Sequence, residues 1–275
     1  MPGTKGLVEN AEDAVKAAGE IGYPVMLKAT GGGGGMGLVT CNTAKEVTQG
    51  FKTVQSRGQT LFKNPGLLIE KYFPASHHIE VQVFGNGKGD AIHFGERECS
   101  IQRRHQKVIE ECPSPFVEKH VGLRDKLTSA AINLARSVKY GSAGTVEYLV
   151  DDETGEYFFL EMNTRLQVEH GITELCYDVD LVKLMLQQAN AELAGQEGLD
   201  FDYLKSLKAE SPRGAAIEVR VYAENPLREY APSPGLLQAV EWAELANTRV
   251  DTWVMTGSTI TPNYGETASS YSRNI

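Results

Sequence analysis

Apolar and polar residues alternate along this chain with two different periods, and each period predicts its own kind of element. Between residues 11 and 18 the apolar side chains follow helical spacing, after a possible cap at Asn10 and before a stop at Gly22. From residue 123 to 138, apolar residues recur every three or four positions, which is typical of an amphipathic helix. Further helices are expected after Asn42 or Thr43 and over residues 181–194.

A period of two predicts strands elsewhere. Residues 79–84 alternate as a half-buried strand does, and residues 91–94 are its expected partner across a glycine-containing turn. Residues 145–150 and 156–161 are predicted to form a second hairpin. Other strands are expected at residues 23–29, 38–41, 67–71 and 216–223. Because hairpins and helices are mixed, the predicted fold class is α+β.

Length and composition limit the classes of protein. The 275 residues suffice for one large domain or two modest ones, and a linker with Pro and Gly at 209–214 divides the chain into 1–208 and 209–275. No apolar run approaches the roughly 18 residues of a membrane span, and the first residues lack a signal-peptide core, so a cytoplasmic protein without membrane contact is expected. The net charge of −9 argues against a nucleic-acid partner.

The cysteines do not suggest a metal or disulfide framework. Cys41, Cys99, Cys112 and Cys176 are scattered, without a Cys-x-x-Cys pair. Most of them are expected to be small core residues.

Five successive glycines follow the strand predicted at residues 23–29. Gly32, Gly34 and Gly37 satisfy the dinucleotide pattern only formally, because a strand and not a helix follows. A glycine loop between two strands can instead close over a ligand and offer backbone N–H groups to phosphates, with Lys28 as a nearby cation. The alternative is a flexible surface loop.

A basic stretch lies between residues 97 and 107. It contains Arg97, Arg103, Arg104, His105 and Lys107. Such a stretch is either a solvated surface or the local positive charge that an anionic ligand requires.

The hairpin around Asp151–Gly155 brings two carboxylates together. If its turn is centred on Thr154, Glu147 lies opposite Glu161, with Cβ atoms roughly 5 Å apart. Two such carboxylates repel each other unless one is protonated or a cation lies between them. A hard divalent ion such as Mg²⁺ fits oxygen ligands of this kind.

The strand from Glu161 is predicted to continue to Glu169, with a polar row on one face. The row consists of Glu161, Asn163, Arg165, Gln167 and Glu169. A solvent-exposed strand face is the alternative, but two carboxylates, two amides and an arginine suit a site better. Glu169 is suited to act as a general base, with Arg165 holding an anion in reach.

Histidines flank these carboxylates. His170 follows Glu169 and could orient it, or could simply be a packed ring. His78 and Glu80 lie on one face of a strand, which could equally be a polar outer face.

Taken in order, these motifs resemble the ATP-grasp region of biotin carboxylases over residues 2 to 264. The more specific stretches are Gln102-Arg-Arg-His-Gln-Lys107 and Met162-Asn-Thr-Arg-Leu-Gln-Val-Glu-His170; Ile69-Glu-Lys-Tyr-Phe73 and Gly144-Thr-Val-Glu147 also match. The resemblance implies an ATP-grasp fold followed by a partial, mainly-β C-terminal subdomain. It also implies a ligase that activates bicarbonate with ATP and carboxylates biotin delivered by a carrier domain of a multidomain carboxylase.

The resemblance implies a role for each matched residue. The ATP site would comprise Lys28, Gly32, Gly33, Gly34, Gly35, Gly37, Glu70, His78, Gln102 and His105. Glu147, Glu161 and Asn163 would bind Mg²⁺ or Mn²⁺, and Arg165, Gln167 and Val168 would hold bicarbonate. Among the catalytic residues Lys107, Arg165, Glu169 and Arg220, Glu169 would deprotonate bicarbonate and Arg220 would stabilise the biotin enolate.

Within the family, the segment from Pro234 to Tyr264 is most similar to urea carboxylase, the first half of urea amidolyase. Met36 stands where a basic residue is usual, and Gly171 where a proline is usual. The family's first α/β domain and the end of its C-terminal subdomain are not matched. The alternatives are a truncated nucleotide-binding fragment without turnover, and another ATP-grasp carbon–nitrogen ligase such as carbamoyl-phosphate synthase.

Overall fold

A computed structural model describes residues 1–31, 37–103, 106–207, 211–243, 245–261 and 266–274. The chain divides into two compact units, and each is described by itself. Unit 1 consists of Met1–Ser76, Arg103–Gln106 and Asp151–Glu153, and unit 2 of His77–Gln102, Lys107–Val150 and Thr154–Ile275. The predicted boundary between residues 208 and 209 falls within 208–210, outside the described residues.

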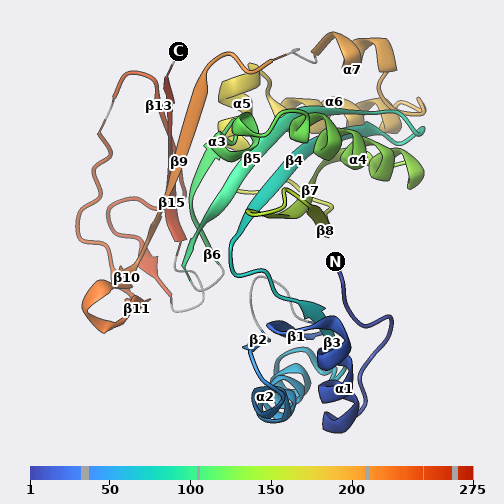
Figure 1. The fold of residues 1–275 in the computed structure, drawn as a ribbon. Coiled ribbons are helices and arrows are strands. Elements are labelled where there is room, and N and C mark those ends of the chain that lie inside the picture. The colour runs from blue at the N-terminus through green and yellow to red at the C-terminus, as the bar shows by residue number, and fades with distance from the viewer. Residues whose placement is uncertain (32–36, 104–105, 208–210, 244, 262–265, 275) are drawn as a thin grey trace. The chain divides into compact units, whose positions relative to one another are not determined.

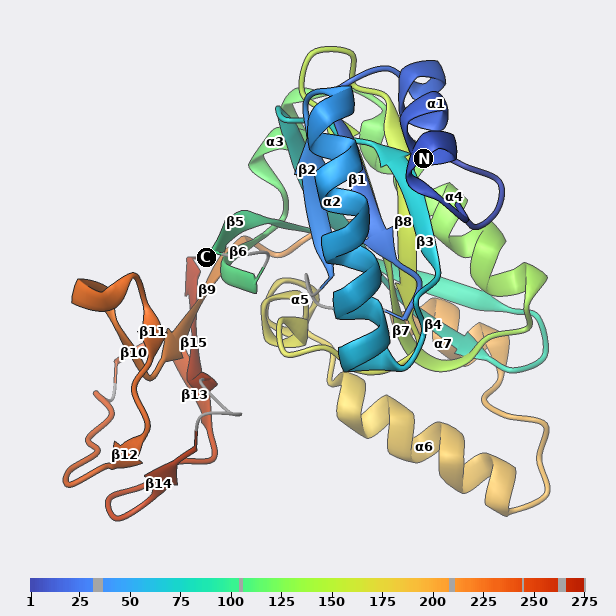
Figure 2. The ribbon, with the colours of Figure 1, turned by 90° about the horizontal axis from the view of Figure 1, so that it is seen from below.

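Unit 1 is a three-stranded antiparallel sheet covered by two helices (Figure 2). The central strand β1 (Val25–Ala29) pairs with β2 (Leu38–Cys41) and with β3 (Leu67–Lys71). α1 (Ala11–Ile21) is capped by Asn10 and α2 (Ala44–Arg57) by Thr43, and a π-helical turn, η1 (Gly58–Phe62), follows α2. The two helices pack on the buried side chains of β1, so the predicted elements of this unit are confirmed.

Unit 2 is built on an eight-stranded sheet with the order β13-β15-β9-β6-β5-β4-β7-β8 (Figure 1). Its strands are β4 (Ser76–Asn86), β5 (Ala91–Arg103), β6 (Gln106–Cys112), β7 (Gly141–Asp151), β8 (Tyr157–Asn163), β9 (Ala215–Tyr222), β13 (Thr248–Thr252) and β15 (Glu266–Asn274). Two short pairs, β10 (Glu224–Asn225) with β11 (Ala231–Pro232) and β12 (Gly235–Leu236) with β14 (Thr259–Ile260), accompany a 3-10 turn, η2 (Pro226–Arg228).

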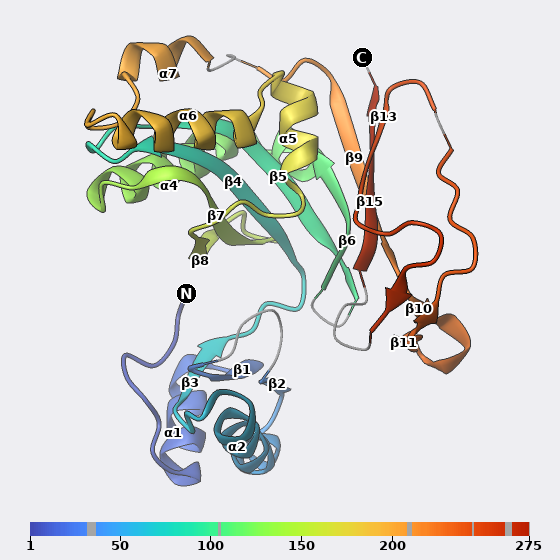
Figure 3. The same ribbon diagram turned by 180° about the vertical axis from the view of Figure 1, so that it is seen from behind.

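Figure 3 shows the described helices of unit 2 from behind. They fall into two groups, each with its own hydrophobic core. α3 (Pro115–Lys119) and α4 (Leu123–Ser137) pack on Ile79, Val81 and Val83 of β4. α5 (His170–Tyr177), α6 (Leu181–Leu193) and α7 (Phe201–Leu207) pack on a core that includes Phe84, Ile92 and Phe94. None of the described helices is both long and apolar enough to cross a membrane.

The prediction of a half-buried strand at 79–84 was wrong in one respect. The pairing with residues 91–94 is confirmed, with Phe84 opposite Ile92. However, Glu80 and Gln82, on the polar face, are as fully buried as Ile79 and Val81 on the apolar face. The polar face therefore lies inside the protein, where its charges need partners.

In β9 the apolar face is the more exposed one and the polar face is buried, which is the reverse of a usual amphipathic strand. Its predicted alternation is present, but Ile217, Val219 and Val221 are each about 40% exposed. Glu218, on the other face, is completely buried, and the Arg220 side chain is only 9% exposed. The polar side of this strand thus faces the interior, toward β6 and the segment that follows β8.

Candidate functional site

The hairpin of β7 and β8 has the predicted register around its carboxylates. Glu147 lies opposite Glu161, and Thr145 opposite Asn163. A bulge after Glu147 shifts the pairing nearer the turn, so Tyr148 faces Phe159. The Asn163 amide donates to Glu147 at 2.8 Å and to Glu161 at 3.1 Å, which places these three side chains together.

The prediction that this strand continues to Glu169 was wrong. β8 ends at Asn163, and residues 164–169 lead without strand pairing into α5. Gln167 and Glu169 are buried, whereas Arg165 and Val168 are exposed. The chain leaves the sheet because Gln167 and Glu169 reach buried polar partners there, which an exposed strand face would not supply.

Lys107 on β6 gathers three carboxylates. Its Nζ lies 3.0 Å from Glu147 and 2.7 Å from Glu169, and it also contacts Glu80. Its side chain is 15% exposed, so these contacts are largely shielded from water. A buried cation of this kind allows carboxylates from three separate segments to converge.

The charges of this cluster shift one another's pKa values. Burial alone would lower the pKa of Lys107, but Glu80 and Glu169 outweigh it and raise that pKa above its ordinary value. Burial opposes ionisation of Glu147, yet the hydrogen bond from His78 and the charge of Lys107 hold its pKa below the usual range. His78, also against burial, has a pKa raised to about 9 by Glu147 and Glu80. The Glu147 carboxylate is therefore held ionised at neutral pH.

His78 and Glu80 belong to the same cluster, which confirms that they share a strand face. His78 Nε2 lies 2.9 Å from Glu147 and 3.3 Å from Glu80. Gln102 Nε2 lies 3.3 Å from the other ring nitrogen of His78. His78, Glu80 and Glu147 bring ligand atoms within 4.8 Å of one another, close enough to hold a metal ion. Glu147, together with Glu161 and Asn163, also forms an oxygen donor set of the kind that suits Mg²⁺.

Arg97 links this cluster to the segment before α5. Its side chain is completely buried and donates to Glu80 and Gln82 on β4 and to Thr145 on β7. It also donates to Gln167 at 3.1 Å and to Thr173 at 3.0 Å. In the sequence, Arg97 belonged to a basic stretch interpreted as either a solvated surface or the positive charge for an anionic ligand. In the structure its guanidinium is buried and paired with Glu80, so it is not a surface cation.

Glu169 lies between two cations. Besides its contact with Lys107, its other carboxylate oxygen accepts from Arg220 at 2.8 Å. Arg165, predicted to accompany Glu169, instead donates to the carbonyl of Leu166 and is exposed. His170 does not orient Glu169 in the described structure, since its Nδ1 faces the carbonyls of Gln167 and Val168.

In unit 1, Lys28 and Glu70 face each other on paired strands. Their charged atoms are 2.8 Å apart, and both side chains are partly exposed. Gly37 has a φ of 80°, which glycine adopts without strain. The predicted site residues Gly32, Gly33, Gly34, Gly35 and His105 lie outside the described residues.

Sequence reasoning missed several members of the site. Gln82 and Thr145 were not identified, and Glu80 and Arg97 were noted only as parts of patterns. The available signal was a charged residue inside a strand flanked by apolar residues, as in Ile79-Glu-Val81. The cysteines, in contrast, were predicted correctly, since all four are free and buried.

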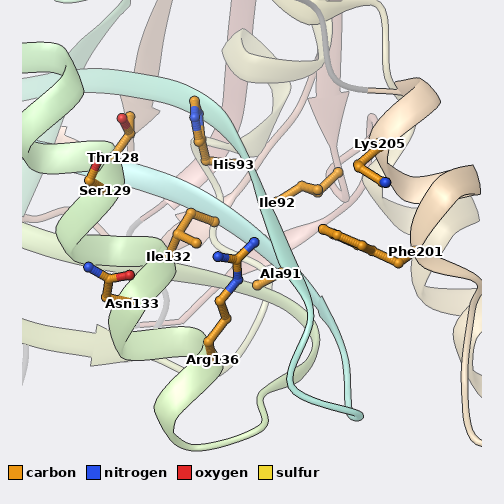
Figure 4. A pocket seen from close by; sticks show the side chains of 10 residues that line it. All are labelled: Ala91, Ile92, His93, Thr128, Ser129, Ile132, Asn133, Arg136, Phe201 and Lys205. Carbon is orange, nitrogen blue, oxygen red and sulfur yellow. The ribbon is translucent and has the colours of Figure 1, made fainter.

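A separate cavity of about 440 Å³ lies in unit 2 at the start of β5, beside α4 and α7 (Figure 4). Phe201 lines it, with Lys205 Nζ 4.7 Å and Arg136 Cζ 5.9 Å from the centre of its ring. None of the described residues predicted for the site lines this cavity.

Two family models match the chain. The ATP-binding domain of the carbamoyl-phosphate synthase L chain matches residues 1–195, which is more than half of the chain. The biotin carboxylase C-terminal domain matches residues 218–269.

Similar proteins come from several carboxylases. "Putative urea carboxylase" of Emericella nidulans is 66% identical over 264 residues, 96% of this chain and 21% of that protein. Urea amidolyase of Saccharomyces cerevisiae is 45% identical over 97% of this chain and 14% of its own length. Biotin carboxylase 1 of Bacillus subtilis is 43% identical over 96% of this chain and 56% of its own length. The chain therefore spans about a fifth or less of the first two relatives.

A solved structure matches the fold. The biotin carboxylase domain of the 2-oxoglutarate carboxylase from Hydrogenobacter thermophilus, in complex with MgADP, ADP and bicarbonate, has a TM-score of 0.89 and 37% identity. The match covers 99% of this chain and 58% of that one. It confirms the predicted α+β class and ATP-grasp fold.

Proposed function

Because this chain belongs to the family of biotin carboxylase ATP-grasp domains with their C-terminal subdomain, we propose that it carries the ATP-dependent carboxylation of biotin with bicarbonate. The observation that supports this most is Glu169, a buried carboxylate held between Lys107 and Arg220. A base between two cations suits the deprotonation of an anionic acid, because the cations attract bicarbonate while the carboxylate accepts its proton.

In the proposed reaction, Glu169 takes the proton of bicarbonate, whose oxygen attacks the terminal phosphorus of ATP. ADP leaves and carboxyphosphate forms. The bond between its carboxyl carbon and the phosphate oxygen then breaks, phosphate leaves with the proton of biotin N1, and that nitrogen bonds to the carboxyl carbon. Lys107 stabilises the transferred phosphoryl group, and Arg220 the biotin enolate. Arg165, Gln167 and Val168 hold bicarbonate. Gln167 is already fixed by Arg97 and by Glu147, to which its amide donates at 2.7 Å.

The nucleotide is proposed to be bound by the residues that match the family's ATP site. These are Lys28, Glu70, His78, Gln102, His105 and the glycines of residues 32–35 and 37. Glu147, Glu161 and Asn163 would hold Mg²⁺ or Mn²⁺, whose charge offsets that of the phosphates. The solved relative in complex with MgADP and bicarbonate supports this set of ligands.

The carboxylase is proposed to be a urea carboxylase. The 66% and 45% identities to proteins named for urea support this, and both are much longer than the chain. Its partners would then be a biotin carboxyl carrier domain and the other domains of a multidomain carboxylase. A cytoplasmic location stays a prediction from the sequence.

The test is ADP release that depends on bicarbonate, measured with free biotin. Glu169→Gln removes the base without changing its size, so the rate should fall by about 10²–10⁴-fold. Lys107→Ala should also lower the rate strongly, while Lys205→Ala, an exposed cation on α7, should not. If folded, ATP-binding protein hydrolyses ATP regardless of bicarbonate and of both site substitutions, the proposal is wrong.

A second candidate follows from the first family match, whose domain comes from carbamoyl-phosphate synthase. That chemistry would use ammonia where the leading proposal uses biotin. Stimulation of ADP release by ammonia, with no response to biotin, would favour it.

A further inference from the structure

The cavity beside α4, α7 and the start of β5 is built from both hydrophobic cores of unit 2. Ile132 of α4 belongs to one core and Ile92 of β5 to the other. Phe201, the first residue of α7, packs against the second core and lines the cavity as well. Small-molecule pockets commonly lie between helices, and about 440 Å³ is within their usual size range.

The deepest part of the cavity is apolar. Ile92 is only 4% exposed and Ile132 only 9%, so the cavity reaches side chains of the two cores. The ring of Phe201 adds an aromatic surface beside them. Such a lining favours the apolar body of a ligand, because contact with it removes apolar surface from water.

α4 supplies a row of polar groups along the same cavity. Ser129, Asn133 and Arg136 are spaced by four and then three residues, which places them on one face of the helix over about 10 Å. All three are exposed. Within the described residues, none of these side chains makes a hydrogen bond or an ion pair with the rest of the chain, so each is available to a ligand.

Arg136 gives the cavity a positive charge that no described carboxylate pairs with. Lys205, the other cation beside Phe201, lies 2.5 Å from Asp202 on its own helix and is therefore already paired. The Cζ atom of Arg136 is 5.9 Å from the centre of the Phe201 ring, and Figure 4 shows the two side chains pointing toward each other. An anion bound by Arg136 would thus lie next to the aromatic surface.

We propose that this cavity binds a small aromatic carboxylate. Arg136 binds the carboxylate, since the fork of its N–H groups matches two carboxylate oxygens. One unpaired cation matches the single charge of a carboxylate better than the nearly double charge of a phosphate group. Phe201 and Ile132 contact the aromatic body, and Ser129 and Asn133 bind a polar group at its far end. The site requires neither nucleotide nor turnover, so it is independent of the proposed function.

The probe for this site is para-hydroxycinnamate, an aromatic ring with a carboxylate at one end and a hydroxyl at the other. Ligand-observed NMR with the full chain should show saturable binding with a Kd of about 1 mM or below, as expected for a ligand of this size. The corresponding amide has the same body without the charge and should bind at least about fivefold more weakly. Absence of saturable binding, or equal binding of the amide, would overturn the proposal.

Substitutions assign the binding to the cavity. Arg136→Gln should raise the Kd at least about fivefold, and Phe201→Leu about two- to tenfold. Because Arg136 is exposed, its replacement should not prevent folding. Lys126→Gln removes another exposed cation of α4, outside the cavity, and is the matched control that should leave the Kd unchanged. If Arg136→Gln binds the probe as tightly as Lys126→Gln does, the assignment is wrong.

A last comparison separates this cavity from the cluster around Lys107, which also attracts anions. Saturating Mg-ATP should not displace the probe, and Arg165→Gln should leave its Kd unchanged. Hydrogen exchange measured by mass spectrometry should be slower in α4 and α7 when the probe is bound, because the ligand contacts both helices. Displacement of the probe by Mg-ATP, or exchange that is unchanged in both helices, would overturn the proposal, whether or not the chain releases ADP.

Discussion

Arg97 illustrates how a single residue can fix several parts of a site. The guanidinium has five N–H donors in a rigid fork, and here it reaches Glu80, Gln82, Thr145, Gln167 and Thr173. Its side chain has no exposed surface. Glu80 therefore depends on Arg97 and Lys107 for its charge balance, and Gln167 depends on Arg97 for its orientation.

Replacing Arg97 should consequently destabilise the fold. Arg97→Leu leaves the Glu80 carboxylate buried with one cation fewer, and the free energy of unfolding should fall by about 3–5 kcal/mol. Arg97→Lys should lose less, because it keeps the charge but not the fork. Urea denaturation measures both. Arg136→Leu, an exposed arginine on α4, is the control and should change stability by about 0.5 kcal/mol or less. Equal losses for Arg97→Leu and Arg136→Leu would contradict this account.

At the scale of elements, local patterns predicted what local forces determine. The caps at Asn10 and Thr43 and the register of Glu147 with Glu161 follow from short-range spacing, and the structure has them. The course of residues 164–169 does not. That course depends on contacts with Arg97 and Lys107, which are distant in sequence. Alternation alone therefore predicted a strand up to Glu169, whereas the observed strand ends at Asn163. The buried polar face of β4 escaped prediction for the same reason.

Two helical glycines of unit 1 make the difference between local and tertiary effects measurable. Gly19 on α1 has open space where a Cβ would be, so Gly19→Ala should stabilise by about 0.5–1 kcal/mol through helix propensity. Gly50 on α2 packs on β1 and β2, and a Cβ there would lie 2.9 Å from Leu27 Cδ1 and 3.1 Å from Cys41 Sγ. Gly50→Val should therefore destabilise by about 1–3 kcal/mol. Chemical denaturation compares the two, and stabilisation by Gly50→Val would refute the packing argument.

At the scale of the whole molecule, the chain carries a net charge of −9 and yet buries several of its glutamates. The burial of these glutamates is possible because a single buried cation can contact two or three carboxylates. Lys107 serves Glu80, Glu147 and Glu169, as Arg220 serves Glu110 and Glu169. A shared cation makes stability sensitive to pH, because each carboxylate can also be neutralised by a proton when the cation is absent.

Lys107→Met should show this sensitivity. In wild type the pKa values of Glu80 and Glu147 are lowered, against the effect of burial, so their contribution to stability is present above about pH 4.5 and is lost as the pH falls through the folded-state pKa values. Without Lys107 those pKa values rise, and protons taken up at low pH replace the missing charge. The substitution should cost about 3–5 kcal/mol at pH 7 and distinctly less at about pH 4, as measured by urea denaturation. Lys205→Met, which removes an exposed cation paired with Asp202, should cost about the same small amount at both pH values. Carboxylates that have lost their cation are stabilised by protonation. If the loss in free energy of unfolding caused by Lys107→Met is the same at both pH values, the carboxylates do not depend on this cation.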